Sequence, residues 1–274
     1  MKRLIIPLSI ILILSLPGYC FSKELPSLGL SKSSHSFYYT SDKNAKEHNW
    51  YFLPEKDEKP SRAEPSSLDL LKKYSGYYLG DTNHKYIYLT FDEGYENGYT
   101  GKILDILKSN NVKAAFFVTV PYIKSNVALV KRMADEGNLV CNHSNTHPSM
   151  AKITDEKKFA WELKSTEEVY KETTGYEISK FFRPPMGKYS ELSLDYTKKL
   201  GYKTVFWSLA YRDWLKDDQP NPERSKQLLL KRTHPGGIYL LHAVSKTNAE
   251  ILDSLIKDWK AKGYEFKTLN DLPK

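Results

Sequence analysis

Two adjacent acids, Asp92 and Glu93, stand where an apolar, strand-like run ends at Phe91. Adjacent carboxylates repel each other, so one interpretation is a charged turn that faces solvent. The other interpretation divides two tasks within one active site. One carboxylate would bind a metal, and its neighbour would stay free to accept a proton as a general base.

Two histidines, His143 and His147, lie four residues apart in the polar segment "NHSNTH". Neutral imidazole is a common zinc ligand, so the pair could share one divalent metal, although two surface histidines in a polar turn are the alternative. A mononuclear hydrolytic zinc site commonly has three protein ligands, and Asp92 and Glu93 are candidates for the third. A water bound to such a metal has its pKa lowered to about 7 and becomes a nucleophile.

Four further residues have chemistry that would complete such a site. Arg183 precedes Pro184–Pro185, and a guanidinium on this rigid support could orient a carboxylate and keep it ionised. Asp213 could orient a histidine, and Trp214 could form an apolar wall of a sugar site. His242 ends an apolar run, and an acid partner would raise its pKa and make it a general acid. Taken singly, each is more simply a surface, loop or core residue.

Alternating hydrophobic patterns predict the elements that position these residues. Apolar runs predict strands at Tyr86–Phe91, Ala114–Val118, Leu139–Asn142, Phe181–Arg183, Lys203–Ser208, Gly237–Leu241 and Tyr264–Leu269. Helical patterns separate them, so the expected fold is α/β, with a parallel sheet covered by helices. Seven short strands favour a distorted, incomplete (β/α)7 barrel over a flat sheet. The candidate site residues all follow strand ends, where α/β barrels build their active sites.

Capping residues predict where several helices begin. Ser125 is the expected N-cap of a helix that buries Val127, and Ser190 caps a helix ending before Gly201. Another helix spans about residues 154 to 173. Pro222 suits the first turn of a further helix, and Asn248 is expected to begin the last one.

The N-terminus has the pattern of an export signal, which we place at residues 1–22. Lys2 and Arg3 precede an apolar run from Leu4 to about Pro17, and small residues follow. The run is short for a membrane span, although an uncleaved anchor stays open as an alternative. After cleavage near Ser22, a single cysteine is left and no internal disulfide can form.

Residues 23–80 are expected to be an N-terminal arm or linker, because they are polar and rich in proline. The aromatic segment Asn49–Pro54 is an exception and is expected to dock on the domain. The formal charge of the 274-residue chain is +8, which would favour an anionic polymer such as a cell wall or simply aid solubility. No arginine-rich helix or base-reading motif indicates a nucleic acid, and no stable protein partner is implied.

Five segments, taken in order, resemble the motifs of the polysaccharide deacetylases, carbohydrate esterase family 4. They are "LTFDEG", "NHSNTH", "FFRPPMG", "RDW" and "IYLLHAVS". The resemblance covers about Lys85 to Leu269, and we expect the NodB-like domain to span residues 81–271. The segments "TFDEGYENGYTGKILDIL" and "HPGGIYLLHAVSKTNAE" look more narrowly like the spore-cortex N-acetylmuramic acid deacetylases.

The resemblance implies a role for each matched residue. Asp92 would be the general base and Arg183 would tether it. His143 and His147 would hold a divalent metal, with zinc expected.

The resemblance also implies the other half of the reaction. The backbone N–H of Met186 would help to stabilise the oxyanion. Asp213 would orient His242, the general acid that protonates the departing amine. The implied reaction is hydrolysis of an N-acetyl group of peptidoglycan, which in the muramic case leaves an amine that can close a δ-lactam.

Two residues depart from the family pattern. Glu93 stands where the wider family has an aspartate that binds the metal, and Met186 stands where it usually has tyrosine. Glu93 could still ligate or could point away. Two rivals stay open: a deacetylase of N-acetylglucosamine in peptidoglycan or chitin, and an inactive glycan-binding domain. The six other motif residues that were given roles above are all retained, and this argues against the inactive glycan-binding domain.

Overall fold

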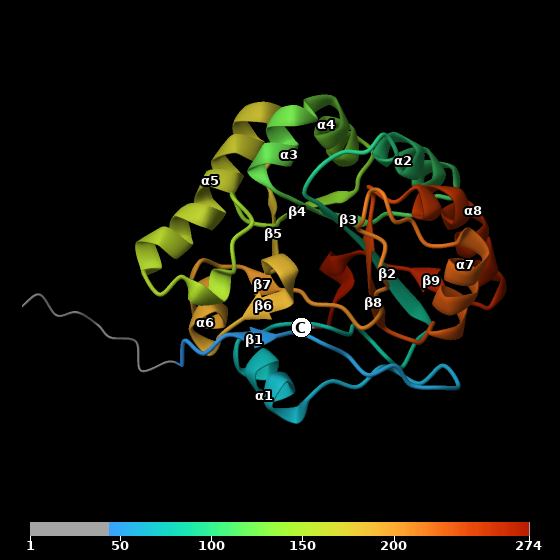
Figure 1. Cartoon of the computed structure of the whole chain (residues 1–274), viewed down its shortest axis with the longest axis horizontal. Coiled ribbons are helices and arrows are strands. Elements are labelled where there is room, and N and C mark those ends of the chain that lie inside the picture. The colour runs from blue at the N-terminus through green and yellow to red at the C-terminus, as the bar shows by residue number, and fades with distance from the viewer. Residues whose placement is uncertain (1–43, 274) are drawn as a thin grey trace, which may run out of the picture. The chain divides into compact units, whose positions relative to one another are not determined.

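The computed structural model describes residues 44–273, and its centre is a parallel β-sheet (Figure 1). Within the described residues the sheet has seven strands in the order β7-β5-β4-β3-β2-β8, and β9 also pairs with β2. The strands are β2 (Tyr86–Glu93), β3 (Ala115–Val118), β4 (Leu139–Asn142), β5 (Ser179–Phe182), β7 (Lys203–Thr204), β8 (Gly237–His242) and β9 (Glu265–Phe266). The predicted parallel α/β architecture is confirmed.

The sheet curls because its two ends meet. The chain beyond β7 leaves β5 and runs to Leu209, which forms a parallel bridge with Tyr239 of β8. The N–H of Leu240 donates to the carbonyl of Leu209 at 2.9 Å. The predicted strand Lys203–Ser208 is therefore regular over only two residues, because its second half crosses to β8. This distortion produces the expected incomplete barrel.

Helices cover the outside of the curled sheet (Figure 1). They are α2 (Thr100–Ser109), α3 (Val120–Ser125), α4 (Val127–Asp135), α5 (Glu156–Thr174), α6 (Glu191–Lys199), α7 (Pro222–Lys231) and α8 (Lys246–Ala261). None of these described helices combines the length and the apolar character that crossing a bilayer requires.

Two predicted helix starts are corrected by the structure. Ser125 ends α3 instead of capping α4, whose N-cap is Asn126, and Val127 is 40% exposed instead of buried. The last helix is capped by Ser245, whose hydroxyl accepts from the N–H of Asn248 at 3.2 Å. The prediction for Ser190 is confirmed, since it forms a capping box at the start of α6.

The alternation of side chains along β2 builds two cores. Ile87, Leu89 and Phe91 pack in the large cluster with residues of α2 and α8. Tyr88 faces the other way and packs in a cluster with Phe117 and other strand residues. Both faces are covered, so the strand is apolar on both sides, as in other buried parallel sheets. Residues at odd positions of β2 thus face the helices, and those at even positions face the inside of the curl.

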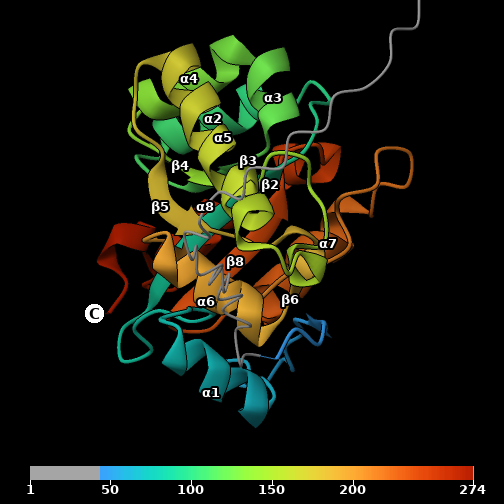
Figure 2. The ribbon, with the colours of Figure 1, turned by 90° about the vertical axis from the view of Figure 1, so that its left-hand side faces the viewer.

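Residues 44–80 are part of the folded unit rather than a linker. Strand β1 (His48–Asn49) pairs antiparallel with β6 (Lys188–Tyr189), and α1 (Pro65–Lys73) lies beside α6 (Figure 2). Trp50 is buried and shares a hydrophobic cluster with residues of α1 and α6. The expected docking of the aromatic segment is thus made by Trp50. The predicted signal at residues 1–22, and the arm up to residue 43, lie outside the described residues.

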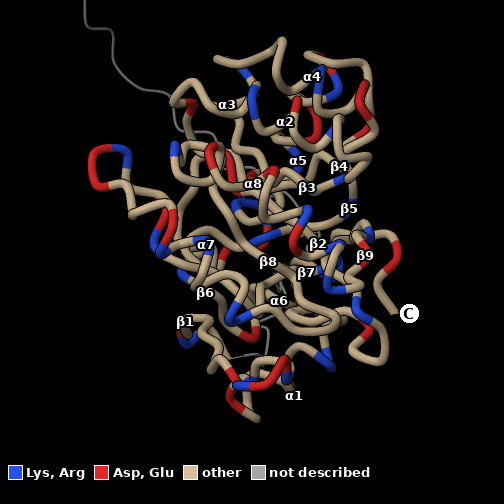
Figure 3. The backbone as a smooth tube through the Cα atoms, turned by 90° about the vertical axis from the view of Figure 1, so that its right-hand side faces the viewer, with Lys and Arg blue, Asp and Glu red and all other residues tan. Residues whose placement is uncertain are grey.

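The charged residues are interspersed over the described part of the chain. Figure 3 shows stretches of Lys and Arg and stretches of Asp and Glu scattered over the described backbone. The net positive charge is therefore spread out, which fits a role in solubility at least as well as a role in attracting an anionic polymer.

Candidate active site

A cavity of about 730 Å³ opens at the carboxyl ends of the strands. Six of the nine predicted site residues line it: Asp92, His143, His147, Met186, Trp214 and His242. Arg183 and Asp213 are fully buried and contact two of these residues from behind. The ninth residue, Glu93, is buried elsewhere.

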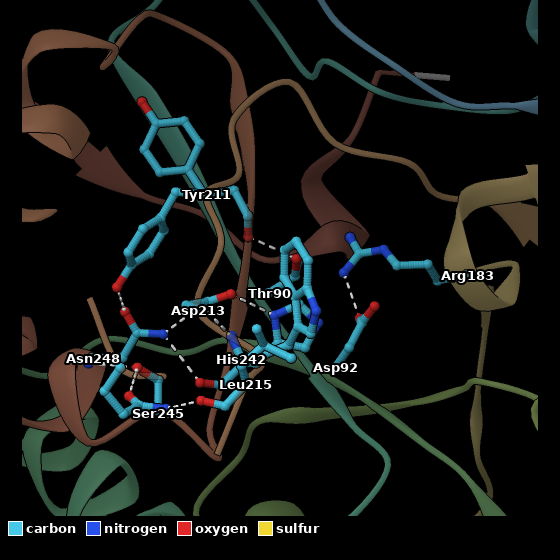
Figure 4. A network of polar contacts seen from close by, with 12 residues as sticks. Thr90, Asp92, Arg183, Tyr211, Asp213, Leu215, His242, Ser245 and Asn248 are labelled. Atoms are coloured by element: carbon cyan, nitrogen blue, oxygen red, sulfur yellow. Dashed lines mark hydrogen bonds and ion pairs between the residues drawn. The ribbon is translucent and has the colours of Figure 1, made fainter. Parts of the chain in front are cut away.

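Asp92 is held by an arginine that the protein surrounds completely (Figure 4). Nη1 of Arg183 donates to Oδ1 of Asp92 at 2.7 Å. The other guanidinium nitrogens donate to the carbonyls of Val205 and Phe206, and the group lies 4.2 Å from the centre of the Phe117 ring. The arginine is thus fixed in position and orientation.

The pKa of Asp92 reflects two opposing effects. Burial raises the pKa of this carboxyl, but the positive charge of Arg183, helped by His143 and His242, outweighs burial and leaves the pKa below its usual range. Asp92 is therefore ionised at neutral pH, as a general base must be.

His242 has an equally well-defined carboxylate partner. Its Nδ1 lies 2.7 Å from Oδ1 of Asp213, and its backbone N–H donates to Oδ2 at 2.9 Å. The side-chain amide of Asn248 donates to the same Oδ2 at 2.6 Å, and the hydroxyl of Tyr211 donates to that amide's oxygen (Figure 4). This network holds the ring with Nε2 free to act.

The same carboxylate sets the protonation of His242. Burial alone would lower the pKa of the imidazole. The charge and hydrogen bond of Asp213 raise it by more than burial lowers it, so the pKa ends above the usual value. His242 is thus disposed to carry a proton and to donate it. Asp92 and His242 are register partners on the neighbouring strands β2 and β8, which places an ionised carboxylate and this imidazole side by side.

Replacing Asp213 with Asn should shift the pH dependence of the enzyme. The raised pKa of His242 keeps the acid form present to higher pH, and activity falls as the pH rises through that pKa. Without the carboxylate the pKa drops, so the alkaline limb of the kcat/KM profile should move to lower pH. We also expect kcat to fall by about 10- to 100-fold. An unmoved alkaline limb in acetate-release assays would contradict the role of Asp213.

The two histidines lie on a loop whose backbone is unusual. Ser144 and His147 adopt positive φ values of 70° and 59°, which non-glycine residues rarely do. Nδ1 of His143 lies 2.8 Å from the carbonyl of Arg183, so that nitrogen carries the hydrogen and Nε2 is free. Nε2 is 3.6 Å from Oδ2 of Asp92, and the two imidazole centres are 4.9 Å apart.

Burial keeps both imidazoles neutral, which a metal ligand requires. It lowers the pKa of His143 to about 4 and also lowers that of His147, although the charge of Asp92 acts in the opposite direction. Together, the two histidines fit a divalent metal as two of its ligands.

Glu93 is on the opposite face of the strand from Asp92. Strand β2 runs two residues beyond its predicted end, and Glu93 pairs with Val118 of β3. Successive side chains of a strand alternate, so Glu93 faces the helices near Tyr122. Both carboxyl oxygens are buried and have no hydrogen-bond partner among the described residues. In the same residues no group of three or more His, Cys, Asp or Glu is arranged to hold a metal. Glu93 does not line the cavity that the two histidines share.

The surroundings of Glu93 keep its carboxyl protonated. Burial and the nearby carboxylates of Glu96 and Asp92 raise the pKa of Glu93 well above its usual value. A carboxyl whose pKa is raised by folding contributes stability below its unfolded pKa of about 4.3. That contribution is lost as the pH rises toward the folded pKa.

The variant Glu93→Gln should remove this pH dependence. Gln has the shape of the protonated acid and never ionises, so its stability advantage over the wild type should grow from pH 5 to pH 8 in urea unfolding. Zinc affinity should stay within about twofold of the wild type, because Glu93 is not placed as a ligand. The same difference in unfolding free energy between variant and wild type at both pH values would refute this assignment. A loss of zinc binding in the variant would also refute it.

Met186 and Trp214 form part of the cavity rim. Met186 adopts φ 58° and ψ 10°, and the residue is 53% exposed. The next residue, Gly187, also has positive φ, and a Cβ there would lie 2.8 Å from the Trp207 ring, so glycine is required. The hydroxyl of Tyr95 donates to the carbonyl of Trp214 at 2.8 Å and links two rim loops. The oxyanion role of the Met186 N–H stays a prediction.

Sequence reasoning missed Glu162 of α5, which supports the histidine loop. Its buried carboxylate accepts from the N–H groups of Asn145 and Thr146, both at 2.9 Å, and from the Thr146 hydroxyl at 2.6 Å. The available signal was a charged residue among the buried positions of a helix, next to Leu163. A buried acid without a local partner usually serves something distant in sequence.

Comparison with known proteins agrees with this geometry. A model of the family "Polysaccharide deacetylase" matches residues 79–205. The peptidoglycan-N-acetylmuramic acid deacetylase PdaA of Bacillus subtilis is 47% identical over 225 residues, which cover 82% of this chain and 85% of that protein. A peptidoglycan-N-acetylglucosamine deacetylase of Bacillus cereus is 31% identical over 243 residues, or 86% of each chain.

A solved structure shares the fold as well as the sequence. The structure of B. subtilis PdaA, described as a family 4 carbohydrate esterase, superposes with a TM-score of 0.81. It has 44% sequence identity, and the match covers 83% of this chain and 97% of that one. Deacetylases of this family are metal-dependent. The chain therefore belongs to the polysaccharide deacetylase family, carbohydrate esterase family 4.

Proposed function

We propose that this protein is a hydrolase that removes the N-acetyl group from N-acetylmuramic acid in peptidoglycan. The observation that supports the chemistry is the pairing of Asp92 with His242 on neighbouring strands. Arg183 keeps the base ionised, and Asp213 keeps the acid protonated. Amide hydrolysis needs both states at once, and this arrangement favours both.

The proposed reaction uses each group once. The carboxylate of Asp92 accepts a proton from the water that attacks the acetyl carbonyl carbon. When the tetrahedral intermediate collapses, His242 donates its proton to the sugar nitrogen and the C–N bond breaks. The products are acetate and a free 2-amino group. A divalent metal held by His143 and His147 would polarise the carbonyl and lower the pKa of the water.

The choice of muramic acid rests on the relatives. The muramic acid deacetylase is 47% identical to this chain, against 31% for the glucosamine enzyme, over similar coverage. The freed amine can close onto the lactyl carboxyl, so we also propose a role in forming muramic δ-lactam in spore cortex. Deacetylation of N-acetylglucosamine in peptidoglycan is the rival activity.

Such a substrate requires the enzyme to work outside the cytoplasm. The basic and apolar start of the sequence is consistent with export. We therefore propose that the protein acts at the cell wall, with the glycan strand as its binding partner.

Muropeptide analysis tests the proposed function. A strain lacking the protein should form cortex without muramic δ-lactam, as measured by mass spectrometry. The purified protein, stripped of metal and then given Zn²⁺, should release acetate from glycan strands only after metal is restored. Unchanged lactam in the strain, with loss of acetyl from glucosamine in the assay, would favour the rival.

A further inference from the structure

The N-terminal segment 44–53 contacts two loops of the active site. It lies outside residues 79–205, which the family model matches. One loop follows His147, and the other, residues 183–189, carries Met186 and ends in β6. The segment pairs with β6 through His48 and Asn49. Glu47 and Trp50 add contacts to both sides of this pairing.

Glu47 bridges the two loops with one carboxylate. The hydroxyl of Ser149, two residues beyond His147, donates to Oε2 of Glu47. Nζ of Lys188, two residues beyond Met186, lies 3.3 Å from Oε1. Each oxygen therefore serves a different loop, and the side chain links segments that are about 40 residues apart in sequence. The pairing of His48 with Tyr189 holds the backbone of Glu47 in place for this contact.

Trp50 also contacts the loop that carries Met186. The backbone N–H of Trp50 donates to the carbonyl of Gly187 at 2.7 Å, and the indole N–H donates to the carbonyl of Trp207 at 2.9 Å. The indole stacks on Phe206 with ring centres 4.7 Å apart. Gly187 and Trp207 both line the cavity.

These contacts reach the catalytic base through one more step. The carbonyl of Phe206 accepts from Nη2 of Arg183, and Arg183 holds Asp92. The segment is therefore connected to the loop beyond the histidines, to the loop with Met186 and to the support of the base.

We propose that residues 47–50 are a positioning element of the active site, in which Glu47 sets the spacing between the two loops and Trp50 sets the conformation at Gly187. This proposal rests on the proposed deacetylation. Misplacing reacting groups by about 1 Å can cost about 100-fold in rate. Loosening either contact should therefore lower turnover more than substrate binding.

The test compares Glu47→Ala with a control from the same segment of the chain. Glu55 also forms an ion pair, with Arg62, and its side chain is 29% exposed against 24% for Glu47. Among residues 44–273 its ion-pair partner is Arg62, away from the active-site loops, so Glu55→Ala removes a comparable carboxylate. For the full chain, we would measure kcat and KM for acetate release from glycan strands, Zn²⁺ affinity by competition with a chelating dye, and Tm.

Glu47→Ala is expected to lower kcat by about 10-fold while KM changes less than about twofold, since the loss is in alignment. Zn²⁺ affinity should fall by about 3- to 10-fold, because the loop that carries His147 loses its contact with Glu47. Contacts that support metal ligands directly commonly have effects of about 10-fold or more. Tm should change by less than about 3 °C, because the ion pair of Glu47 with Lys188 is only partly buried. Glu55→Ala should leave all three unchanged.

Two further variants separate positioning from general stability. Glu47→Gln keeps an oxygen for Ser149 but loses the charge that attracts Lys188, so it should restore part of kcat. Ser149→Ala in the Glu47→Ala background should add little to the loss of kcat, since both belong to one contact. Unchanged kcat and Zn²⁺ affinity in Glu47→Ala, or equal effects in Glu55→Ala, would overturn the proposal.

The outcome also distinguishes this proposal from the proposed function. If the wild type releases no acetate from muramic acid, the proposed function fails. The role of Glu47 is then tested by Zn²⁺ affinity alone. Equal Zn²⁺ affinity in Glu47→Ala and in the wild type would refute that role.

Discussion

The variant Asp92→Asn is expected to lose about 10³-fold or more in kcat at neutral pH while KM changes little. Its amide has the size of the carboxylate but cannot accept the proton of the attacking water. An oxygen stays available to Nη1 of Arg183, so the hydrogen bond seen at 2.7 Å can persist. The measurement is acetate release from glycan strands, followed over several pH values.

Stability must be measured with this variant, because Arg183 is fully buried. Removing the charge of its partner leaves a buried cation without compensation, which costs up to about 3–5 kcal/mol of unfolding free energy. We expect a lower Tm with an unchanged circular dichroism spectrum at 25 °C. Asp217→Asn, at an exposed loop acid, is the matched control and should behave as wild type. Activity of Asp92→Asn close to wild type would exclude Asp92 as the base.

The variant His143→Ala is expected to lose both metal and activity. His143 is one of two imidazoles that fit a metal, and its Nε2 is oriented by the carbonyl of Arg183. With one protein ligand left, Zn²⁺ affinity should fall by at least about 100-fold. The loss in kcat should be about 10³-fold, since a metal held by the histidines would lower the pKa of the attacking water and polarise the carbonyl.

Metal analysis of the purified variant checks this result. His84 is a suitable control, because it is exposed and pairs with Asp81 away from the cavity. His84→Ala should keep the metal content of the wild type. Full metal occupancy in His143→Ala would show that the metal is held elsewhere.

The departure at Glu93 bears on how the metal is bound. The family resemblance implied a carboxylate ligand at this position, but the structure places the side chain under the helices, where its oxygens have no hydrogen-bond partner within residues 44–273. The histidines would then hold the metal as its two protein ligands, which leaves more of its coordination sphere to solvent and substrate. Weak binding that needs added metal in assays is the expected consequence.

The sequence by itself determined the order of strands and helices and six of the residues that line the cavity. These were predictable because hydrophobic alternation is a local property, and because parallel strands bring their carboxyl ends to one edge. The capping box at Ser190 was also local and was found. The roles of Arg183 and Asp213 came from the family motifs, and their burial behind Asp92 and His242 is consistent with them.

Only the tertiary structure decided the side on which Glu93 lies and which distant residues support the loops. Pairing with β3 extends β2 to Glu93, and the alternation then places two adjacent acids on opposite faces. Glu47 meets Ser149 across 102 residues of sequence, and Glu162 meets the loop at Thr146 from a neighbouring helix. Such contacts depend on how packed elements approach each other in space, so no local pattern of residue types records them.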